Sequence, residues 1–372
     1  TTLYHLIFVV KIKIIMKVSI LGNSLTSLTL AKLLVNQDIR VDIYSFGKII
    51  KKNQIQTIGI SKTNIDFFNN NILNIKKLIW NIQKIEILSE NLNSEKILNF
   101  KNNENHLFSI IKNYDLYNFI KKNLKKNKLV KFKNYITYQN LLKSNYNLIF
   151  NCDKENFISK KFFSKTINKN YKSRAYITTL KHEKLSNNFT ATQIFTKKGP
   201  LAFLPVSSTE TSVVYSIKGK KNFDIKDSIK KHNTKYKILK INDFLNFELK
   251  ASSLRSYYHK NIIAFGDMLH RLHPLAGQGF NMTIRDMKEI HRLILFKKEH
   301  GLDLDLSLSS EFEKNMKDKN YLFSSGIDFI YEFFNLESKT KNKILSKTIK
   351  LLGKNSHLNK RFIKIADNGF LF

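Results

Sequence analysis

The sequence is short of cysteine, proline, glycine and arginine, and each shortage excludes something. A single cysteine, Cys152, excludes an internal disulfide and any cysteine-based metal site. Twelve glycines and three prolines leave few positions with special backbone properties. Arginine supplies only seven of the 64 basic residues, whereas proteins that read nucleic acids use clustered arginine. A direct nucleic-acid function is therefore disfavoured, despite a formal charge of +35.

Long apolar runs are missing as well. No segment reaches the roughly 18 consecutive apolar residues that a membrane-spanning helix needs, and the run LIFVVKIKIIM is interrupted by Lys11 and Lys13. Met16 stands directly before a clean strand pattern, so we expect residues 1–15 to be an upstream extension. The 42% of hydrophobic residues is enough for real cores, and 372 residues predict about two domains.

A strand, a tight turn and a helix open the clean part of the sequence. In KVSILGNSLTSLTLAKLLVNQDIRVDIYS, a buried run ends at Gly22, and leucine and alanine then recur at helical spacing before a second apolar run. This order predicts a βαβ unit whose helix points its amino end at a bound ligand. Alternating β-forming residues in 171–217 predict an antiparallel sheet inserted between pieces of the first domain.

Three glycines and a proline gather in one stretch, AFGDMLHRLHPLAGQGFNMTIRD. A buried strand ends at Gly266, and Asp267 follows at the place where open α/β sheets bind ligands. Its carboxylate is placed there to accept hydrogen bonds from the hydroxyls of a sugar or polyol chain. Gly277 and Gly279 let the backbone approach a flat ring closely, and the helix that begins near Asn281 directs its positive end toward that ring.

Two other interpretations of this stretch stay open. It is also compatible with a purely structural loop between a strand and a helix. His270 and His273 are candidate metal ligands, but they stand three residues apart with no third ligand in view. Loop packing or a contact with substrate fits them better.

The same stretch, from Gly266 to Asp286, resembles the signature of the ubiquinone-biosynthesis FAD-dependent hydroxylases, class A flavin monooxygenases with the p-hydroxybenzoate hydroxylase fold. QIFTKKGPLAFLPVSSTETSVVYSI is similar to a segment of that family's substrate domain. The first βαβ unit, the helix near residue 115 and the carboxyl-terminal helical pattern follow in the same order. The likeness covers essentially residues 16–372, and the block from Asp267 to Asp286 is its specific part.

The resemblance implies an α/β fold with a Rossmann-like FAD-binding domain, an inserted antiparallel β-sheet substrate domain and a helical carboxyl-terminal region. The FAD-binding domain would be discontinuous, and the inserted sheet, including the segment GPLAFLP, would cover the substrate. The implied boundaries are 16–75, 101–165 and 255–298 for the FAD-binding domain, 76–100 and 166–254 for the substrate domain, and 299–372 for the carboxyl-terminal helices.

An activity follows from the resemblance too. Such an enzyme binds FAD, takes hydride from NAD(P)H and uses O₂ to hydroxylate the aromatic ring of a polyprenyl phenol in ubiquinone biosynthesis. No catalytic base can be named, because an activated phenol needs little acid–base help. Its insoluble substrate would be met at a membrane surface or within a complex of quinone-biosynthesis proteins. We therefore expect a cytoplasmic protein, with peripheral binding to the inner face of the membrane or a merely solvated lysine surface as the two alternatives.

The family pattern assigns FAD contacts to the first phosphate turn and to the signature stretch. Asp267 would hold the ribityl chain, and the loop from Pro274 to Asn281 would line the isoalloxazine ring. The expected contacts are Gly22, Ser24, Leu25, Gly266, Asp267, Pro274, Gly277, Gln278, Gly279, Phe280 and Asn281.

The adenine side of the expected site departs from the family pattern. The phosphate loop G-x-G-x-x-G keeps only Gly22, with serine at positions 24 and 27. At roughly 1–3 kcal/mol for each lost hydrogen bond, such changes together would weaken FAD binding by orders of magnitude. The other departures are Ser45, or Asp42 within the strand, in place of the acidic residue for the ribose, Tyr114 in place of an arginine, and Lys154 after Asp153 in place of a glycine.

These departures keep two further hypotheses open beside a working hydroxylase. One is a catalytically degenerate member that acts as a component of a quinone-biosynthesis complex. The other is a different flavin enzyme on the same fold, such as a halogenase or a reductase of isoprenoid lipids.

Overall fold

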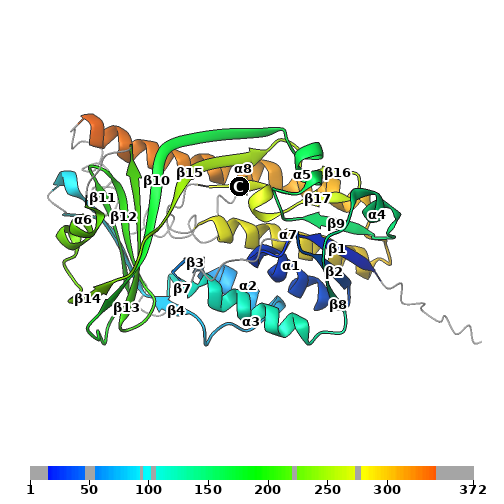
Figure 1. The fold of residues 1–372 in the computed structure, drawn as a ribbon, viewed down its shortest axis with the longest axis horizontal. Helices are drawn as coiled ribbons and strands as arrows, with labels where there is room; N and C mark the ends of the chain where they lie inside the picture. The colour runs from blue at the N-terminus through cyan, green and yellow to red at the C-terminus, as the bar shows by residue number, and fades with distance from the viewer. Residues whose placement is uncertain are drawn as a thin grey trace, which may run out of the picture.

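The computed structural model describes residues 16–46, 55–92, 95–101, 106–219, 224–272 and 278–340. Within these ranges the strands form sheets of six, nine and three strands, with helices packed against them (Figure 1). This mixed α/β architecture, which ends in long helices, confirms the predicted fold class.

The six-stranded sheet contains the predicted βαβ unit. β1 (Lys17–Leu21) pairs in parallel with β2 (Arg40–Tyr44), and α1 (Leu25–Val35) connects them. Ten of the eleven residues of α1 are buried, because the helix contacts β2, α3 and α7 at once. The strand order is β16–β17–β9–β1–β2–β8, with β16 antiparallel to β17 and the other pairs parallel. The remaining members are β8 (Val130–Lys133), β9 (Leu148–Asn151), β16 (Tyr258–His259) and β17 (Ile262–Ala264).

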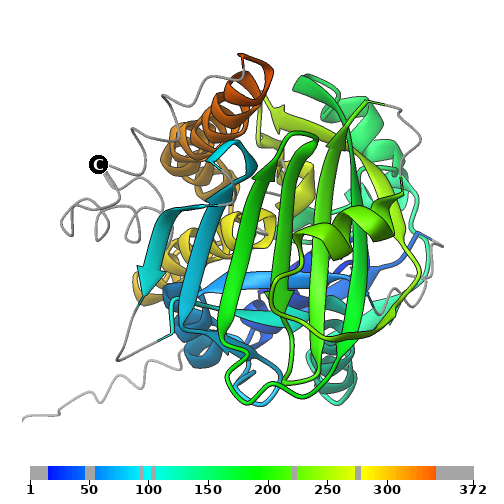
Figure 2. The ribbon, with the colours of Figure 1, turned by 90° about the vertical axis from the view of Figure 1, so that its left-hand side faces the viewer.

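The nine-stranded sheet stands at one end of the molecule, and Figure 2 looks onto its face. Its order is β18–β15–β10–β13–β12–β11–β5–β6, and β14 also pairs with β10. Helix α6 (Ile225–His232) crosses this face and buries Ile229 in the core beneath it. The strands are β5 (Lys84–Ser89), β6 (Glu95–Lys101), β10 (Thr166–His182), β11 (Thr190–Thr196), β12 (Gly199–Pro205), β13 (Glu210–Lys218), β14 (Ile238–Ile241), β15 (Leu245–Leu254) and β18 (His270–Arg271).

A small antiparallel sheet of β3 (Thr57–Ser61), β7 (Phe108–Lys112) and β4 (Trp80–Ile82) lies between the two larger sheets (Figure 1). Helix α2 leaves β3 directly, and α3 leaves β7 directly, so both helices are tied to this sheet. The helices not yet bounded are α2 (Lys62–Asn71), α3 (Asn113–Lys125), α4 (Tyr138–Lys143), α5 (Phe157–Phe162) and the 3₁₀ turns η1 (Glu90–Leu92) and η2 (Gly266–Met268).

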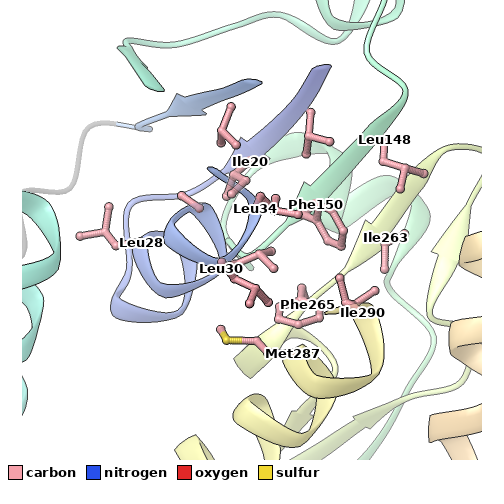
Figure 3. Close-up of a cluster of buried hydrophobic side chains, with 14 of the residues drawn as sticks. Ile20, Leu28, Leu30, Leu34, Leu148, Phe150, Ile263, Phe265, Met287 and Ile290 are labelled. Atoms are coloured by element: carbon pink, nitrogen blue, oxygen red, sulfur yellow. The ribbon is translucent and has the colours of Figure 1, made fainter. Parts of the chain in front are cut away.

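Two long helices close the fold. α7 (Gln278–Glu299) packs against α1 and the six-stranded sheet, and Figure 3 shows Met287 and Ile290 of α7 gathered with Leu30, Phe150 and Phe265 in one buried cluster. α8 (Leu306–Thr340) has 35 residues, about 50 Å of helix. Its first half buries side chains in the core of the six-stranded sheet, and its second half packs on β10 and β15. In the described ranges, no helix combines the length and apolarity needed to cross a bilayer.

Two short strands lie on other sheets than their positions in the sequence suggest. β4, within the segment 76–100 expected in the substrate sheet, pairs with β7 of the small sheet. β18, within the segment 255–298 expected in the FAD-binding domain, pairs with β15 of the nine-stranded sheet. Strands of two or three residues carry too little pattern to reveal their partners. The domain boundaries themselves stay a prediction.

Candidate functional site

The turn after β1 is built so tightly that only glycine fits at its first position. Gly22 has φ +114°, and a Cβ placed on it would lie 3.3 Å from both Asp153 Cβ and Ser27 Oγ. Its N–H donates to the carbonyl of Tyr44 at 2.9 Å. The turn is therefore pressed between the ends of β2 and β9 and the first turn of α1.

Ser24, at the position of the second family glycine, is the N-cap of α1. The Ser27 N–H donates to Ser24 Oγ at 3.2 Å, and the Ser24 N–H donates to Ser27 Oγ at 3.3 Å. Such a capping box satisfies two of the amides at the start of a helix. Among the described residues, the N–H groups of Leu25 and Thr26 have no hydrogen-bond partner, so these two remain for a ligand.

The loop after β17 lies flush on this helix end. Gly266 has φ +65°, and a Cβ there would lie 2.5 Å from Thr26 Cγ2. Asp267 is exposed between the buried Gly266 and Met268, and among the described residues no hydrogen bond or ion pair engages its carboxylate. Burial raises the pKa of the nearby Cys152 thiol to about 12, and the negative charges of Asp153 and Asp267 add to this effect. The site therefore offers one open acceptor, Asp267, beside a protonated thiol.

At the start of α7, one of the expected contacts has a different role in the protein. Asn281 is buried, and its Oδ1 accepts hydrogen bonds from the Ser61 N–H and from Asn64 Nδ2, each at 2.9 Å. Its Nδ2 donates to the Gly59 carbonyl at 2.9 Å. The side chain thus fastens α7 to β3 and α2, and only the backbone of Asn281 is left for a ligand.

The other described residues at this helix start are less constrained or half-buried. A Cβ on Gly279 would meet no atom of the described residues within 4 Å, so packing within the described part of the chain does not demand a glycine there. Phe280 is half-buried against the main core. Pro274 and Gly277 lie outside the described residues, and Gln278 is described only as the first residue of α7.

His270 belongs to a buried pair that the sequence did not reveal. Its Nε2 lies 2.6 Å from Asp286 Oδ2, with both side chains essentially inaccessible to solvent, and Asn320 Nδ2 donates to Asp286 Oδ1 at 2.9 Å. The pair joins β18 to α7 and α8, so His270 takes part in packing, one of the two roles expected for it. His273 lies outside the described residues, and in the described part of the chain no three His, Cys, Asp or Glu residues gather as a metal site would require.

On the adenine side, Asp42 is committed elsewhere. Lys133 Nζ and the Tyr146 hydroxyl donate to its Oδ2 at 2.8 and 2.6 Å. Burial raises the pKa of Asp42, but these hydrogen bonds outweigh burial and hold the pKa below its ordinary value. Ser45 follows β2 and is held by its N–H to the Lys133 carbonyl at 3.1 Å. Neither residue offers a ribose the free carboxylate of the family pattern.

The expected contacts therefore fall into three groups. Those around the first turn of α1 lie together, those at the start of α7 lie together, and two are not described. The first group is Gly22, Ser24, Leu25, Gly266 and Asp267; the second is Gln278, Gly279, Phe280 and Asn281; the third is Pro274 and Gly277.

Comparisons with known proteins point in the same direction. No protein-family model matches the sequence. The mitochondrial ubiquinone biosynthesis monooxygenase COQ6 of Schizosaccharomyces pombe is 22% identical over 272 residues, which are 60% of this chain and 57% of that protein. Ubiquinone hydroxylase UbiL of Rhodospirillum rubrum is 24% identical over 175 residues, 44% of this chain and 41% of that protein. The chain spans about half the length of these curated relatives.

Solved structures extend the likeness over nearly the whole fold. The structure of Klebsiella pneumoniae HpxO complexed with FAD and uric acid matches with a TM-score of 0.71, covering 95% of this chain and 96% of that one. At 10% identity this match establishes the fold alone. The resemblance inferred from the signature stretch is thus confirmed: the chain is similar in sequence to ubiquinone-biosynthesis hydroxylases and has the fold of the FAD-dependent monooxygenases.

Proposed function

We propose that this chain is an FAD-dependent monooxygenase that hydroxylates the aromatic ring of a polyprenyl phenol in ubiquinone biosynthesis, with NAD(P)H and O₂ as co-substrates. The observation that carries the proposal is the Asp267 carboxylate, exposed and without a partner among the described residues at the end of β17. Gly266 holds it against the amino end of α1 by a contact that only glycine permits. A carboxylate in this place is suited to ligand hydroxyls.

The residues fit the ribityl and ring half of FAD better than its adenosine half. Asp267 is an open acceptor for ribityl hydroxyls, and the space beside Gly279 admits a close approach to the start of α7. The free amides of Leu25 and Thr26 suit a phosphate oxygen. On the adenosine side, by contrast, Asp42 is occupied by Lys133 and Tyr146.

Bound FAD would supply hydride uptake and oxygen activation. The chain's own residues would position the ligand and exclude water. The amino end of α7 would favour negative charge on a ring bound beside it, and the nine-stranded sheet would cover the substrate. Gly199, at the start of β12, lets this strand lie close to β13 in the sheet, because a Cβ there would lie 2.1 Å from the Ser216 carbonyl oxygen.

The substrate's polyprenyl tail would bring the enzyme to a membrane surface or to other quinone-biosynthesis proteins. Large apolar side chains exposed along α8 support such a contact, namely Tyr321, Leu322 and Phe329. The excess of lysine adds attraction to anionic headgroups.

The activity is tested with the full chain, FAD, NAD(P)H and a short-chain prenyl phenol under ¹⁸O₂. We expect a product that carries one ¹⁸O atom, formed in proportion to the NAD(P)H consumed. If NAD(P)H is oxidised but only hydrogen peroxide forms with every phenol tried, the proposed hydroxylase activity is contradicted. The absence of any flavin-dependent oxidation would contradict flavin chemistry as a whole.

The Ser24 capping box and the engaged Asn281 favour a second candidate, a degenerate member that supports a quinone-biosynthesis complex without catalysis. The two candidates differ in their need for Asp267. Asp267→Ala should abolish rescue of quinone synthesis in a strain that lacks this protein if the chain is an enzyme. Full rescue by that variant, at equal protein level, would favour the degenerate member.

A further inference from the structure

A lysine and an arginine stand beside the open carboxylate of Asp267. Lys154 follows β9 at the position where the family has glycine, and its Nζ donates to Ser252 Oγ on β15 at 3.1 Å. Ser252 pairs in turn with Arg271 of β18. Lys154 is exposed, yet the protein around its ammonium group lowers its pKa by reducing hydration; the charge of Asp267 raises this pKa and that of Arg271 lowers it. Lys154 is therefore near enough to Asp267 and to Arg271 to feel the charge of each.

This group of charges lies next to the phosphate turn. Lys154 directly follows Asp153, whose Cβ would lie 3.3 Å from a Cβ on Gly22. Asp267 directly follows Gly266, which packs on Thr26 in the first turn of α1. The loop that carries Lys154 and the loop that leads to Arg271 thus both touch the amino end of α1.

The acidic neighbours do not neutralise both cations. Asp153 Oδ1 accepts the Glu155 N–H at 2.9 Å, so that carboxylate is turned back into its own loop. Asp267 adds a single negative charge near Lys154. Holding two cations together without a matching anion costs free energy, and sites where like charges are held together are often functional.

The phosphate turn has meanwhile lost part of its usual means of binding an anion. The Ser24–Ser27 capping box uses two amides of the first turn, and a serine side chain stands where a glycine would let the diphosphate approach the backbone. A chain that gives up amide donors can hold a diphosphate with side-chain cations instead.

We propose that Lys154 and Arg271 bind the diphosphate of the dinucleotide, in place of the glycine-rich turn. This rests on the proposed function, since it concerns how the same FAD is held. Recognition by side-chain cations is electrostatic, so the affinity for FAD should fall steeply with added salt. Riboflavin, which has no phosphate, should bind by the ring and ribityl contacts alone and be little affected by salt.

The test compares FAD and riboflavin binding to the full chain by quenching of flavin fluorescence. Lys154→Gln should weaken FAD binding about tenfold, equivalent to about 1.4 kcal/mol, and leave riboflavin binding unchanged. Lys154→Arg keeps the charge and should retain most of the affinity for FAD. Lys160→Gln, an exposed lysine of α5, is the matched control and should change neither ligand. Unfolding of each apo variant in urea shows whether the fold is intact.

The outcomes separate the two proposals. If Lys154→Gln binds FAD within twofold of the unchanged chain, or loses riboflavin equally, the diphosphate role is overturned while FAD binding stands. If Lys154→Arg is as weak as Lys154→Gln, the lysine acts through its packing with Ser252 and the role is also overturned. If the unchanged chain binds neither ligand, the proposed function fails and this inference with it.

Discussion

Replacing Gly266 with alanine perturbs the contact that seats the Asp267 loop on α1. Gly266 has φ +65°, and the new Cβ would lie 2.5 Å from Thr26 Cγ2 and 3.1 Å from Thr26 Oγ1. A left-handed conformation costs a residue with a Cβ about 1–2 kcal/mol, and relieving a buried overlap costs about 1–3 kcal/mol more. We therefore expect Gly266→Ala to lower the free energy of unfolding by about 2–5 kcal/mol.

Gly301 separates the two costs, because it has φ +66° and a Cβ added to it would meet no atom within 4 Å in the part of the chain that the structure describes. Gly301→Ala carries the conformational cost alone and should lose about 1–2 kcal/mol. Thr26→Ser removes the obstructing methyl group, so it should restore part of the stability of Gly266→Ala but none of that of Gly301→Ala. Urea unfolding followed by circular dichroism measures each single and double variant. Equal losses in Gly266→Ala and Gly301→Ala would refute the close packing of the loop on α1.

Two further substitutions test side chains that form hydrogen bonds within the protein. Asp42→Asn should lower the free energy of unfolding by about 1–3 kcal/mol at neutral pH. The pKa of Asp42 is lowered in the folded protein. The stability that its carboxylate contributes is therefore present above the unfolded pKa and is lost as the pH falls through the folded pKa. Urea melts at pH 7 and pH 3 check this, and an equal loss at both would contradict it. Asn281→Ala removes the hydrogen bonds that this side chain makes with the Ser61 N–H and the Gly59 carbonyl, so it should cost roughly 2–4 kcal/mol and leave the FAD affinity of the folded protein nearly unchanged. Unaltered stability with lost FAD affinity would show instead that this side chain belongs to the ligand.

The parts of the fold that sequence reasoning found are those set by short-range pattern. β1, the turn at Gly22, α1 and β2 follow one another within 28 residues, so apolar periodicity and one glycine are enough to place them. The strand that ends before Gly266 was found in the same way. Family resemblance supplied the rest of the topology, which local pattern does not contain.

Contacts between segments far apart in the chain could not be predicted from the sequence. Asn281 bonds to Ser61 across 220 residues, and no periodicity marks such a pair. His270 and Asp286 are separated by a loop and lie on different elements, so their pairing was equally hidden. His270, Asn281 and Asp286 all belong to the signature stretch, so part of this stretch makes contacts within the protein.

Ser24 is an exception, because its role as the N-cap of α1 can be predicted from the sequence. Taken as a lost glycine, it suggested only weaker binding of the cofactor. A serine directly before a leucine-rich helix is also a typical N-cap signal, and the structure gives it that role. The same substitution therefore stabilises α1 while it removes amides from the phosphate turn.

The central claim is that the Asp267 carboxylate holds a flavin at the end of β17. Fluorescence titration of the full chain with FAD tests it most directly, with Asp303→Asn, an exposed aspartate of the loop before α8, as the matched control. We expect Asp267→Asn to weaken both FAD and riboflavin binding by roughly 10- to 100-fold, the value of a charge-assisted hydrogen bond, and Asp303→Asn to change neither. Equal affinities for Asp267→Asn and the unchanged chain would contradict the account.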